Sequence, residues 1–297
     1  MSSLPPPSSA AFSERVRALP RLGLGISTEF EAQRMGGLDP LALHDAHPEL
    51  VSFLEIGADL ERGVDADAAQ WVERGLPVTY HFLDVNLEEE EDLDDAWIRD
   101  TAQLAREVGA AWLCGDAGLW HVGPRERGHG VLAPPVLEPE SAAAMARSVR
   151  RLREETGFEV LPENPPAHLY LGRMHLLEYY AEVVTQADSG MLLDVAHLAV
   201  FQHVRDHDPL TGLDSFPLER VVEMHVAGGT PFEEGGRTFI EDDHGTNVLD
   251  ATWTILDHVL PRATNLKALV FEGERNRAED VLPVFRTLAE RLESAPS

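Results

Sequence analysis

The chain has 297 residues, with 52 acidic and 24 basic side chains and a formal net charge of −28. A charge of this sign argues against any partner held mainly by phosphate neutralisation, so we expect no nucleic acid partner. The length suits a single α/β barrel of about 250 residues, and a hydrophobic content of 43% is sufficient for one globular core.

The predicted elements begin after a polar segment. Residues 1–20 read as a disordered N-terminal tail that lacks the basic and apolar regions of a signal peptide. Residues 21–297, which we expect to form one metal-dependent catalytic domain, alternate short apolar runs with longer Ala- and Leu-rich segments. The apolar runs predict strands at Leu22–Ile26, Val51–Ile56, Pro77–Phe82, Ala111–Gly115, Phe158–Pro162, Met191–Val195, Val221–Val226 and Lys267–Phe271. The longer segments predict helices at Asp94–Val108, Glu140–Thr156, Met174–Ala187, Asp250–Leu260 and Asp280–Leu292.

This alternation of strands and helices predicts parallel pairing with right-handed crossovers, and hence an α/β fold of the (β/α)8 TIM barrel type. A doubly wound open sheet is the competing fold, but its Gly-rich phosphate loop is matched only weakly by residues 22–30, LGLGISTEF. Long loops are predicted at residues 122–138 and 201–216. Loops after barrel strands lie on the catalytic face, so we expect both to shape access to a site.

Cysteine content and hydropathy restrict the class of protein further. Cys114 is the only cysteine, so the chain can form neither an internal disulfide nor a Cys-x-x-Cys motif. We expect it to be a small buried residue of a strand. No run of residues approaches the roughly 18 apolar residues of a membrane helix. We therefore expect no membrane partner and a cytoplasmic location.

Acidic side chains and histidines recur at one end of the predicted strands. From the second strand onward the series is Glu55, His81, Asp116, Glu163, Asp194 with His197, His225 and Glu272, and Asp242 and His244 lie between the last two. Each residue alone is more typical of a structural histidine or a helix cap. The carboxyl ends of barrel strands, however, all open on the same mouth. The joint pattern therefore predicts a multi-metal site.

The spacing of these residues suits shared ions. Asp194 and His197 are three positions apart just after a strand, so they can chelate one ion or bind two neighbouring ions. Asp242 and His244 are two positions apart, and such side chains point the same way in extended backbone. A glutamate at a strand end, such as Glu163, can bridge two ions.

The types of ligand narrow the choice of metal. Histidines and carboxylates without a thiolate favour Fe, Mn or Zn, and several imidazoles argue against a pure Mg or Ca site. Roughly seven or eight ligands are too many for one ion, so two or three ions are implied. Such a site could activate water or, with iron, activate O2 at a bound thiolate.

Several short motifs resemble one known family. They are LGLGIS, FLEIG, the third-strand His81, ENPPAHLY, GMLLDVAH, VEMHVAGG, the Asp242-x-His244 pair and LVFEGE. With these motifs the chain, from about Leu22 to Asn276, resembles the multinuclear non-haem iron-dependent oxidases, formerly domain of unknown function 692. The resemblance implies a TIM barrel with two or three iron ions in a mixed Fe(II)/Fe(III) state and O2 as co-substrate. It further implies oxidative modification of cysteines in a ribosomally made precursor peptide, with a partner protein that presents the peptide.

The resemblance also assigns the residues of the site. By position the metal ligands are His81, Glu163, Asp194, His197, His225, Asp242, His244 and Glu272, and Asn164 is a further candidate site residue. One motif departs from the family. After the fourth strand the family usually reads Ser-Asp/Glu-His, whereas this chain reads Gly115-Asp116-Ala117. Either Asp116 replaces the missing histidine or His121 reaches the site from further along the loop; otherwise a dinuclear site is expected.

Two other functions remain open. The same order of ligands resembles the xylose-isomerase-like barrels and the trinuclear zinc endonucleases of abasic-site repair, which implies a Zn- or Mn-dependent sugar isomerase or phosphoester hydrolase. The net charge of −28 speaks against a DNA substrate. Lys267, the only lysine, starts the last strand and is expected at the far end of the barrel, away from an isomerase site. A non-catalytic peptide-binding barrel is the third possibility, and an acidic body would attract a basic leader peptide.

Overall fold

Eight parallel strands form a closed barrel in the computed structural model, which describes residues 11–28, 36–125 and 131–294. The barrel strands are β1 (Gly23–Ser27), β2 (Phe53–Ala58), β3 (Val78–Phe82), β4 (Leu113–Asp116), β5 (Val160–Glu163), β6 (Met191–Asp194), β7 (Val221–Ala227) and β10 (Ala268–Glu272). Neighbours around the barrel follow chain order, and β10 closes it against β1. The predicted (β/α)8 barrel is therefore confirmed.

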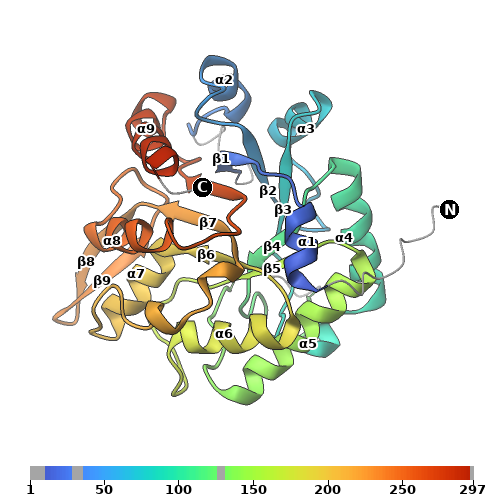
Figure 1. Cartoon of the computed structure of the whole chain (residues 1–297), viewed down its shortest axis with the longest axis vertical. Helices are drawn as coiled ribbons and strands as arrows, with labels where there is room; N and C mark the ends of the chain where they lie inside the picture. The colour runs from blue at the N-terminus through green and yellow to red at the C-terminus, as the bar shows by residue number, and fades with distance from the viewer. Residues whose placement is uncertain (1–10, 29–35, 126–130, 295–297) are drawn as a thin grey trace.

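Helices surround the barrel (Figure 1). They are α1 (Phe12–Ala18), α2 (Pro40–Ala46), α3 (Ala66–Glu73), α4 (Asp95–Val108), α5 (Pro139–Thr156), α6 (Leu176–Ala187), α7 (Val195–Val204), α8 (Asp250–Val259) and α9 (Ala278–Ser294). The ends of α4 follow from local chemistry. Asp94 caps its N-terminus by accepting the backbone N–H groups of Ala96 and Trp97. Gly109 ends the helix with a φ of 73°, a conformation that glycine adopts without strain.

The structure corrects the predicted N-terminal tail. Residues 1–10 lie outside the described residues, but residues 12–18 form helix α1 rather than a disordered segment. Its Phe12 and Val16 side chains are buried in the same cluster as Trp112, just before β4, and Leu192 of β6. Helix α1 thus closes the amino-terminal end of the barrel. The segment is mostly polar, so its two apolar side chains at helical spacing gave only a weak signal. Their burial offsets the loss of conformational entropy when the segment becomes ordered.

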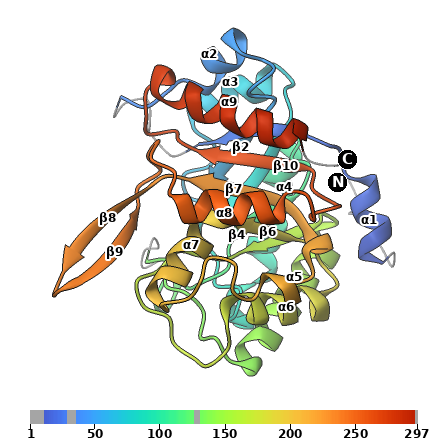
Figure 2. The ribbon, with the colours of Figure 1, turned by 60° about the vertical axis from the view of Figure 1, so that its left-hand side comes forward.

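Two further segments differ from the predictions. Residues 201–204, expected in a loop, complete helix α7, which starts directly after β6. Strands β8 (Gly229–Glu234) and β9 (Arg237–Asp242) form an antiparallel hairpin between β7 and α8. Figure 2 shows this hairpin projecting from the body of the barrel. Its tight turn, Gly235-Gly236, has positive φ at both residues, a signal that predicts a hairpin from sequence.

The strand register brings the carboxyl ends of the strands to one level. Asp116 at the end of β4 pairs with Glu163 at the end of β5. Asp194 at the end of β6 pairs with His225 of β7. Because all strands are parallel, these side chains are delivered to the same mouth of the barrel.

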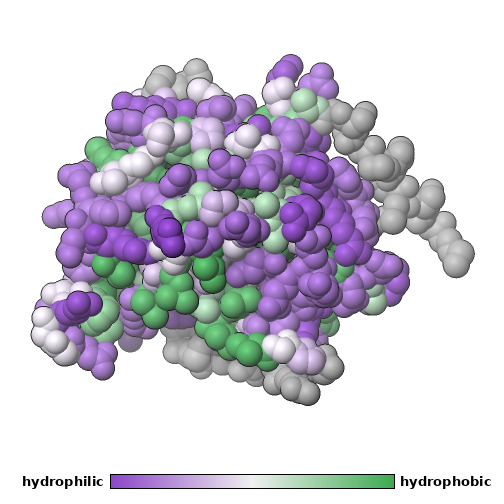
Figure 3. All heavy atoms as spheres, turned by 90° about the horizontal axis from the view of Figure 1, so that it is seen from below, coloured by the Kyte–Doolittle hydropathy of each residue, from purple (hydrophilic) through white to green (hydrophobic). Residues whose placement is uncertain are grey.

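Most of the face in Figure 3 is hydrophilic, with hydrophobic side chains gathered mainly in its lower half. This matches the excess of acidic residues in the chain. Among the residues that the structure describes, no helix combines the length and the apolar character needed to cross a membrane.

Candidate metal centre

Four groups of buried acids and histidines adjoin one another inside the mouth of the barrel. In each group the ligand atoms lie within 4.8 Å of one another. The groups are Glu55 with Glu223 and His225, His81 with Asp116 and Glu163, Glu163 with Asp194 and His197, and Asp194 with His225 and Glu272. Shared members link the groups into one continuous cluster. Adjacent ions in such an arrangement would share bridging ligands.

Strands β3, β4 and β5 supply the first part of the cluster. Nε2 of His81 lies 2.8 Å from Oε2 of Glu163. Asp116 joins them from the end of β4, and its Oδ1 atom is buried without a hydrogen-bond partner. A histidine and two carboxylates at this spacing are suitable ligands for a divalent transition metal.

The junction of β6 and α7 supplies the second part. Asp194 ends β6 and caps α7, because its Oδ1 accepts the backbone N–H of His197. The ring of His197 lies one helical turn further, with Nδ1 3.6 Å from Oε1 of Glu163. The direct change from strand to helix therefore explains why residues three apart face the same space.

Strands β7 and β10 supply the third part. Nδ1 of His225 lies 3.3 Å from Oε1 of Glu163 and 3.4 Å from Oε1 of Glu272. Glu163 thus approaches both His81 and His225, from opposite sides of the barrel mouth. This makes Glu163 the best-placed carboxylate to bridge two ions.

The hairpin returns the last two predicted ligands to the mouth. Asp242 ends β9, and its Oδ2 lies 3.0 Å from Nε2 of His197. His244 follows with a φ of 50°, so this pair is not in continuous extended backbone as expected. Its Nε2 nonetheless lies 3.7 Å from Oδ2 of Asp242. The left-handed residue turns the ring back toward the site.

The cluster contains buried polar atoms that have no hydrogen-bond partner among the residues that the structure describes. They are Asp116 Oδ1, Glu163 Oε1, Asp194 Oδ2, Glu223 Oε1, His225 Nδ1 and Glu272 Oε2. Buried polar atoms in folded proteins nearly always have partners, so a convergence of unpaired ones needs an explanation. All are atoms of metal-ligand type, with lone pairs or titratable protons. The donor set therefore fits a group of bound transition metal ions.

The charges of the cluster favour protonated histidines while no cation neutralises the acids. Burial lowers the pKa of His81, but the charge of Glu55 and the hydrogen bond and charge of Glu163 outweigh it and raise that pKa to about 9. Burial likewise opposes a raised pKa at His225, which the charges of Glu55 and Glu163 nevertheless hold well above its usual value. Metal ions and protons would compete for these nitrogens.

Two aspartates of the cluster favour their neutral form, whereas the histidines favour their charged form. Burial, together with the charge of Glu163, raises the pKa of Asp116 to about 7. Burial and the charges of Glu272 and Glu163 raise the pKa of Asp194 well above its usual value. Glu163 differs because it faces two imidazoles, and the charge and hydrogen bond of His225 and the bond from His81 lower its pKa to about 2 despite burial.

Of the predicted site residues outside the metal ligands, the structure brings only Asp116 into the cluster through its side chain. The amide of Asn164 is buried, and it donates to the backbone carbonyl of Asp194 and accepts its N–H. Asn164 therefore fixes the end of β6. The expectation that His121 reaches the site is wrong, because its ring nitrogens contact Asp92 and the carbonyl of Gly123. Ala117 packs in the hydrophobic core, and Asp116 is the residue at the end of β4 whose side chain joins the cluster.

Sequence reasoning missed Glu223 in the cluster, two positions before His225, and Glu274 beside it. Oε1 of Glu274 lies 2.7 Å from Nδ1 of His244, and its Oε2 accepts a hydrogen bond from Ser27. Glu274 follows Glu272 at the same two-residue spacing as the Asp242 and His244 pair. This spacing is the sequence signal that could have predicted Glu274 as a residue of the site. Glu274 orients His244 through the nitrogen that faces away from Asp242.

A cavity of about 460 Å³ opens above the cluster. Its floor includes His81, Asp116 and Glu272, and Trp120 and Leu132 form part of its wall. Leu132 comes from the predicted loop 122–138, in agreement with the expectation that this loop shapes access, and Trp120 lies just before it. No residue of the other predicted loop, 201–216, is among the described residues that line this cavity. The cavity is large enough for a side chain of a substrate but not for a folded domain.

Comparison with known proteins identifies a family. A family model described as RiPP precursor modification enzyme MbnB/TglH/ChrH matches residues 23–295. A RiPP is a ribosomally synthesised and post-translationally modified peptide. A UPF0276 protein of Anaeromyxobacter sp. (strain Fw109-5) is 26% identical over 201 residues, which cover 67% of this chain and 69% of that protein. A UPF0276 protein of Caulobacter vibrioides (strain NA1000 / CB15N) is 25% identical over 289 residues, or 91% and 98% of the two chains.

Solved structures share the fold. The TTHB071 protein from Thermus thermophilus, soaked with ZnCl2, matches with a TM-score of 0.53 and 20% identity over 90% of this chain and 98% of its own. An L-ribulose 3-epimerase matches with a TM-score of 0.52 and 14% identity over 93% and 99%. A xylose isomerase domain protein of Salmonella typhimurium matches with a TM-score of 0.54 and 12% identity over 93% and 97%. At these identities the likeness establishes the TIM-barrel fold alone.

Proposed function

The chain belongs to the MbnB/TglH/ChrH family of RiPP precursor modification enzymes, and from this membership we propose that it is a multinuclear non-haem iron-dependent oxidase. Its substrate is a cysteine-containing precursor peptide, and O2 is the co-substrate. The observation that carries the proposal is the convergence of unpaired, buried histidine and carboxylate atoms beneath a side-chain-sized cavity. These ligands suit iron and leave the thiolate position to a substrate.

Three sets of residues would hold the ions. The first set is His81, Asp116 and Glu163; the second is Glu163, Asp194, His225 and Glu272; and the third is His197, Asp242 and His244. Iron held there would supply one-electron redox chemistry and a Lewis acid for the thiolate of the substrate. Asp116 is the fourth-strand ligand of the first set. The histidine that the family usually has one position later is Ala117 here, so this set is the one most altered in this chain.

The chain's own residues prepare the site for a peptide side chain. Trp120 and Leu132 exclude water from one side of the cavity. Asp116 lies in its floor with a pKa raised to about 7 by burial and by the charge of Glu163. As a ligand of the first set, Asp116 would hold its ion beside the incoming side chain.

Metal content tests the nature of the centre. The protein, purified without air and analysed for transition metals, is expected to contain two or three iron ions per chain. Zinc alone would instead favour the metal-dependent isomerase or hydrolase. That alternative has no supporting observation beyond the shared fold, and Lys267, the only lysine, packs at the opposite end of the barrel against β7.

A peptide assay tests the reaction. A cysteine-bearing precursor peptide encoded beside this chain is the substrate to use, with and without O2. We expect a change in peptide mass that requires both iron and O2 and that disappears when cysteine is replaced by serine. Turnover of the peptide in the absence of O2 would contradict the oxidase.

A partner protein that presents the peptide is part of the proposal. The formal charge of −28 favours capture of a basic leader peptide or of a basic face of the partner. Binding of the precursor is therefore expected to weaken as salt concentration rises. Affinity that does not change with salt would remove this electrostatic argument and leave the metal centre unaffected.

A further inference from the structure

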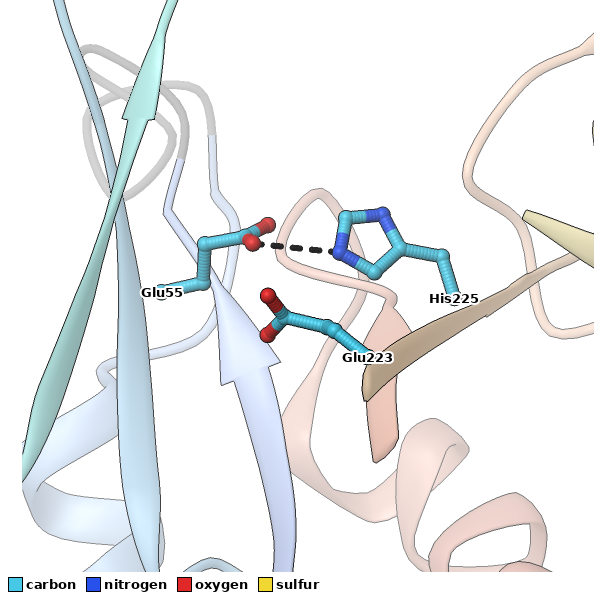
Figure 4. A group of neighbouring side chains, drawn as sticks. All are labelled: Glu55, Glu223 and His225. Atoms are coloured by element: carbon cyan, nitrogen blue, oxygen red, sulfur yellow. Dashed lines mark hydrogen bonds and ion pairs between the residues drawn. The ribbon is translucent and has the colours of Figure 1, made fainter. Parts of the chain in front are cut away.

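A buried polar layer lies directly beneath the proposed metal centre. Figure 4 shows Glu55 of β2 and Glu223 and His225 of β7 pointing toward one another across the barrel interior. Glu55 is 2% exposed, and Glu223 and His225 are fully buried. Neither glutamate belongs to the three sets of residues that would hold the iron ions. Charged groups at this depth are costly unless another group requires them.

The two ring nitrogens of His225 have different surroundings. Nε2 lies 3.1 Å from Oε2 of Glu55. Nδ1 has no hydrogen-bond partner and approaches Glu163 and Glu272, the neighbouring ligands of the second set. A neutral imidazole has one N–H and one lone pair, so a carboxylate that accepts from Nε2 leaves the lone pair on Nδ1. The lone pair then faces the centre.

Glu55 is itself held in place from below. The thiol of Cys114, a residue of β4, donates to the same Oε2 atom at 3.2 Å. Cys114 also lies 3.5 Å from the carbonyl of Tyr80. Burial, and the charges of Glu223 and Glu55, raise the pKa of the thiol well above its usual value, so it stays a donor. The single cysteine of the chain therefore orients Glu55.

Glu223 takes a separate part in this layer. Its Oε2 accepts a hydrogen bond of 2.6 Å from Nε1 of Trp112. With Nε2 of His225 and Oε2 of Glu55 already bonded to each other, the layer is better suited to orienting a ligand than to holding another ion.

We propose that Glu55 is a positioning residue of the metal centre. It accepts the Nε2–H of His225, fixes that tautomer, and aims Nδ1 at the ion shared with Glu163 and Glu272. This role rests on the proposed metal centre. A carboxylate behind a metal-bound histidine fixes the ring and makes it a stronger ligand, and loss of such a partner typically lowers metal affinity by about 10- to 100-fold.

Binding of Zn(II) to the purified full-length chain tests the proposal, because zinc is redox-inert and diamagnetic. Glu55→Met keeps the length of the side chain but removes the acceptor, so we expect Zn(II) affinity to fall by about 10- to 100-fold in competition with a chelator. Glu55→Gln keeps a carbonyl acceptor and is expected to restore most of the affinity. Asp84→Asn is the matched control, because it changes a buried acid outside the cluster, one that accepts a hydrogen bond from Trp97, and leaves the Glu55–His225 contact in place.

The position of the proton on His225 separates the two roles that Glu55 can have. It depends on Glu55 if this residue positions the ring, and it does not if Glu55 only stabilises the fold. With ¹⁵N-labelled histidine in the Zn(II)-loaded wild type, we expect His225 to carry its proton on Nε2 and the metal on Nδ1, and a His225→Gln variant assigns its signal. This measurement needs no folded Glu55 variant. A proton on Nδ1, or unchanged zinc affinity in Glu55→Met, would overturn the positioning role alone. A wild type that binds neither zinc nor iron would overturn the metal centre itself, and this role with it.

Discussion

Nε2 of His81 lies 2.8 Å from Oε2 of Glu163, although the two residues are 82 positions apart in the chain. The contact joins β3 to β5 across the end of β4. It shows how parallel strands of a barrel convert distant sequence positions into one site. The same glutamate approaches His225 from the other side, at 3.3 Å from Nδ1.

Metal binding is expected to release protons. Burial lowers the pKa of His81, but the charge of Glu55 and the contacts with Glu163 raise it to about 9, so this imidazole is protonated in the metal-free chain at neutral pH. An incoming ion must displace that proton, and affinity should therefore rise as pH increases toward about 9. Zinc titration calorimetry in buffers of different ionisation enthalpy measures the protons released. A binding heat independent of the buffer would contradict this expectation.

Glu163 should be needed for more than one ion. Glu163→Gln leaves its shape but weakens the ligand shared by the first and second sets, so the chain is expected to lose at least one metal ion per molecule. Metal analysis after equilibration with excess Fe(II) in the absence of air measures the loss. Glu234→Gln, an exposed acid of the hairpin, is the control and should keep the wild-type content.

The position of Ala117 makes the fourth strand testable. Ala117 is fully buried in the hydrophobic core, so Ala117→His should overpack that core and lower the free energy of unfolding by about 1–3 kcal/mol. It should not increase metal content. Asp116→His places the imidazole in the cluster instead, and is expected to retain the metal. Urea denaturation and metal analysis separate the two variants, and a metal gain in Ala117→His would show that the strand register differs.

Tyr180 of α6 should stabilise the ends of β4 and β5. Its hydroxyl lies 3.0 Å from the carbonyl oxygens of both Ala117 and Glu163. Tyr180→Phe removes a buried hydrogen bond and is expected to lower the free energy of unfolding by about 0.5–1.5 kcal/mol. It should also loosen Glu163, which thermal melting with and without zinc can detect as a smaller stabilisation by the metal. Tyr179→Phe, whose hydroxyl contacts Ser141, is the control for zinc-dependent stabilisation.

Contacts between helix α1 and Asp188 should make the free energy of unfolding decrease at low pH. Burial opposes the shift, but the Phe12 N–H and Arg15 lower the pKa of Asp188 below 3.8. The folded state thus favours the ionised form. Its contribution is present above pH 4 and is lost as pH falls through the lowered pKa. Asp188→Asn should cost about 1 kcal/mol or less at pH 7, because the carboxylate is partly exposed, and less than that at pH 2. An equal effect at both values would exclude the charge.

The residues of the site could be predicted because their chemistry recurs in a simple pattern. Strand ends at Asp116, Glu163 and Asp194 agree to within a few residues with the predicted runs. The hairpin was missed, since reading Asp242 and His244 as a loop overlooked the Gly-Gly turn before them. Helix α1 was missed because its polar residues resemble those of the segment before it.

What the sequence determined by itself was the barrel and the inventory of ligands, because apolar periodicity and residue type are local properties. Tertiary structure decided which side chains meet. It brought Asp116 into the cluster, turned His121 toward Asp92, and set Asn164 to hold Asp194 through its backbone. It alone placed Glu55 behind His225, 170 positions away. Such contacts depend on strand register and on which face of each strand points inward, and these are fixed only when all eight strands close into one barrel.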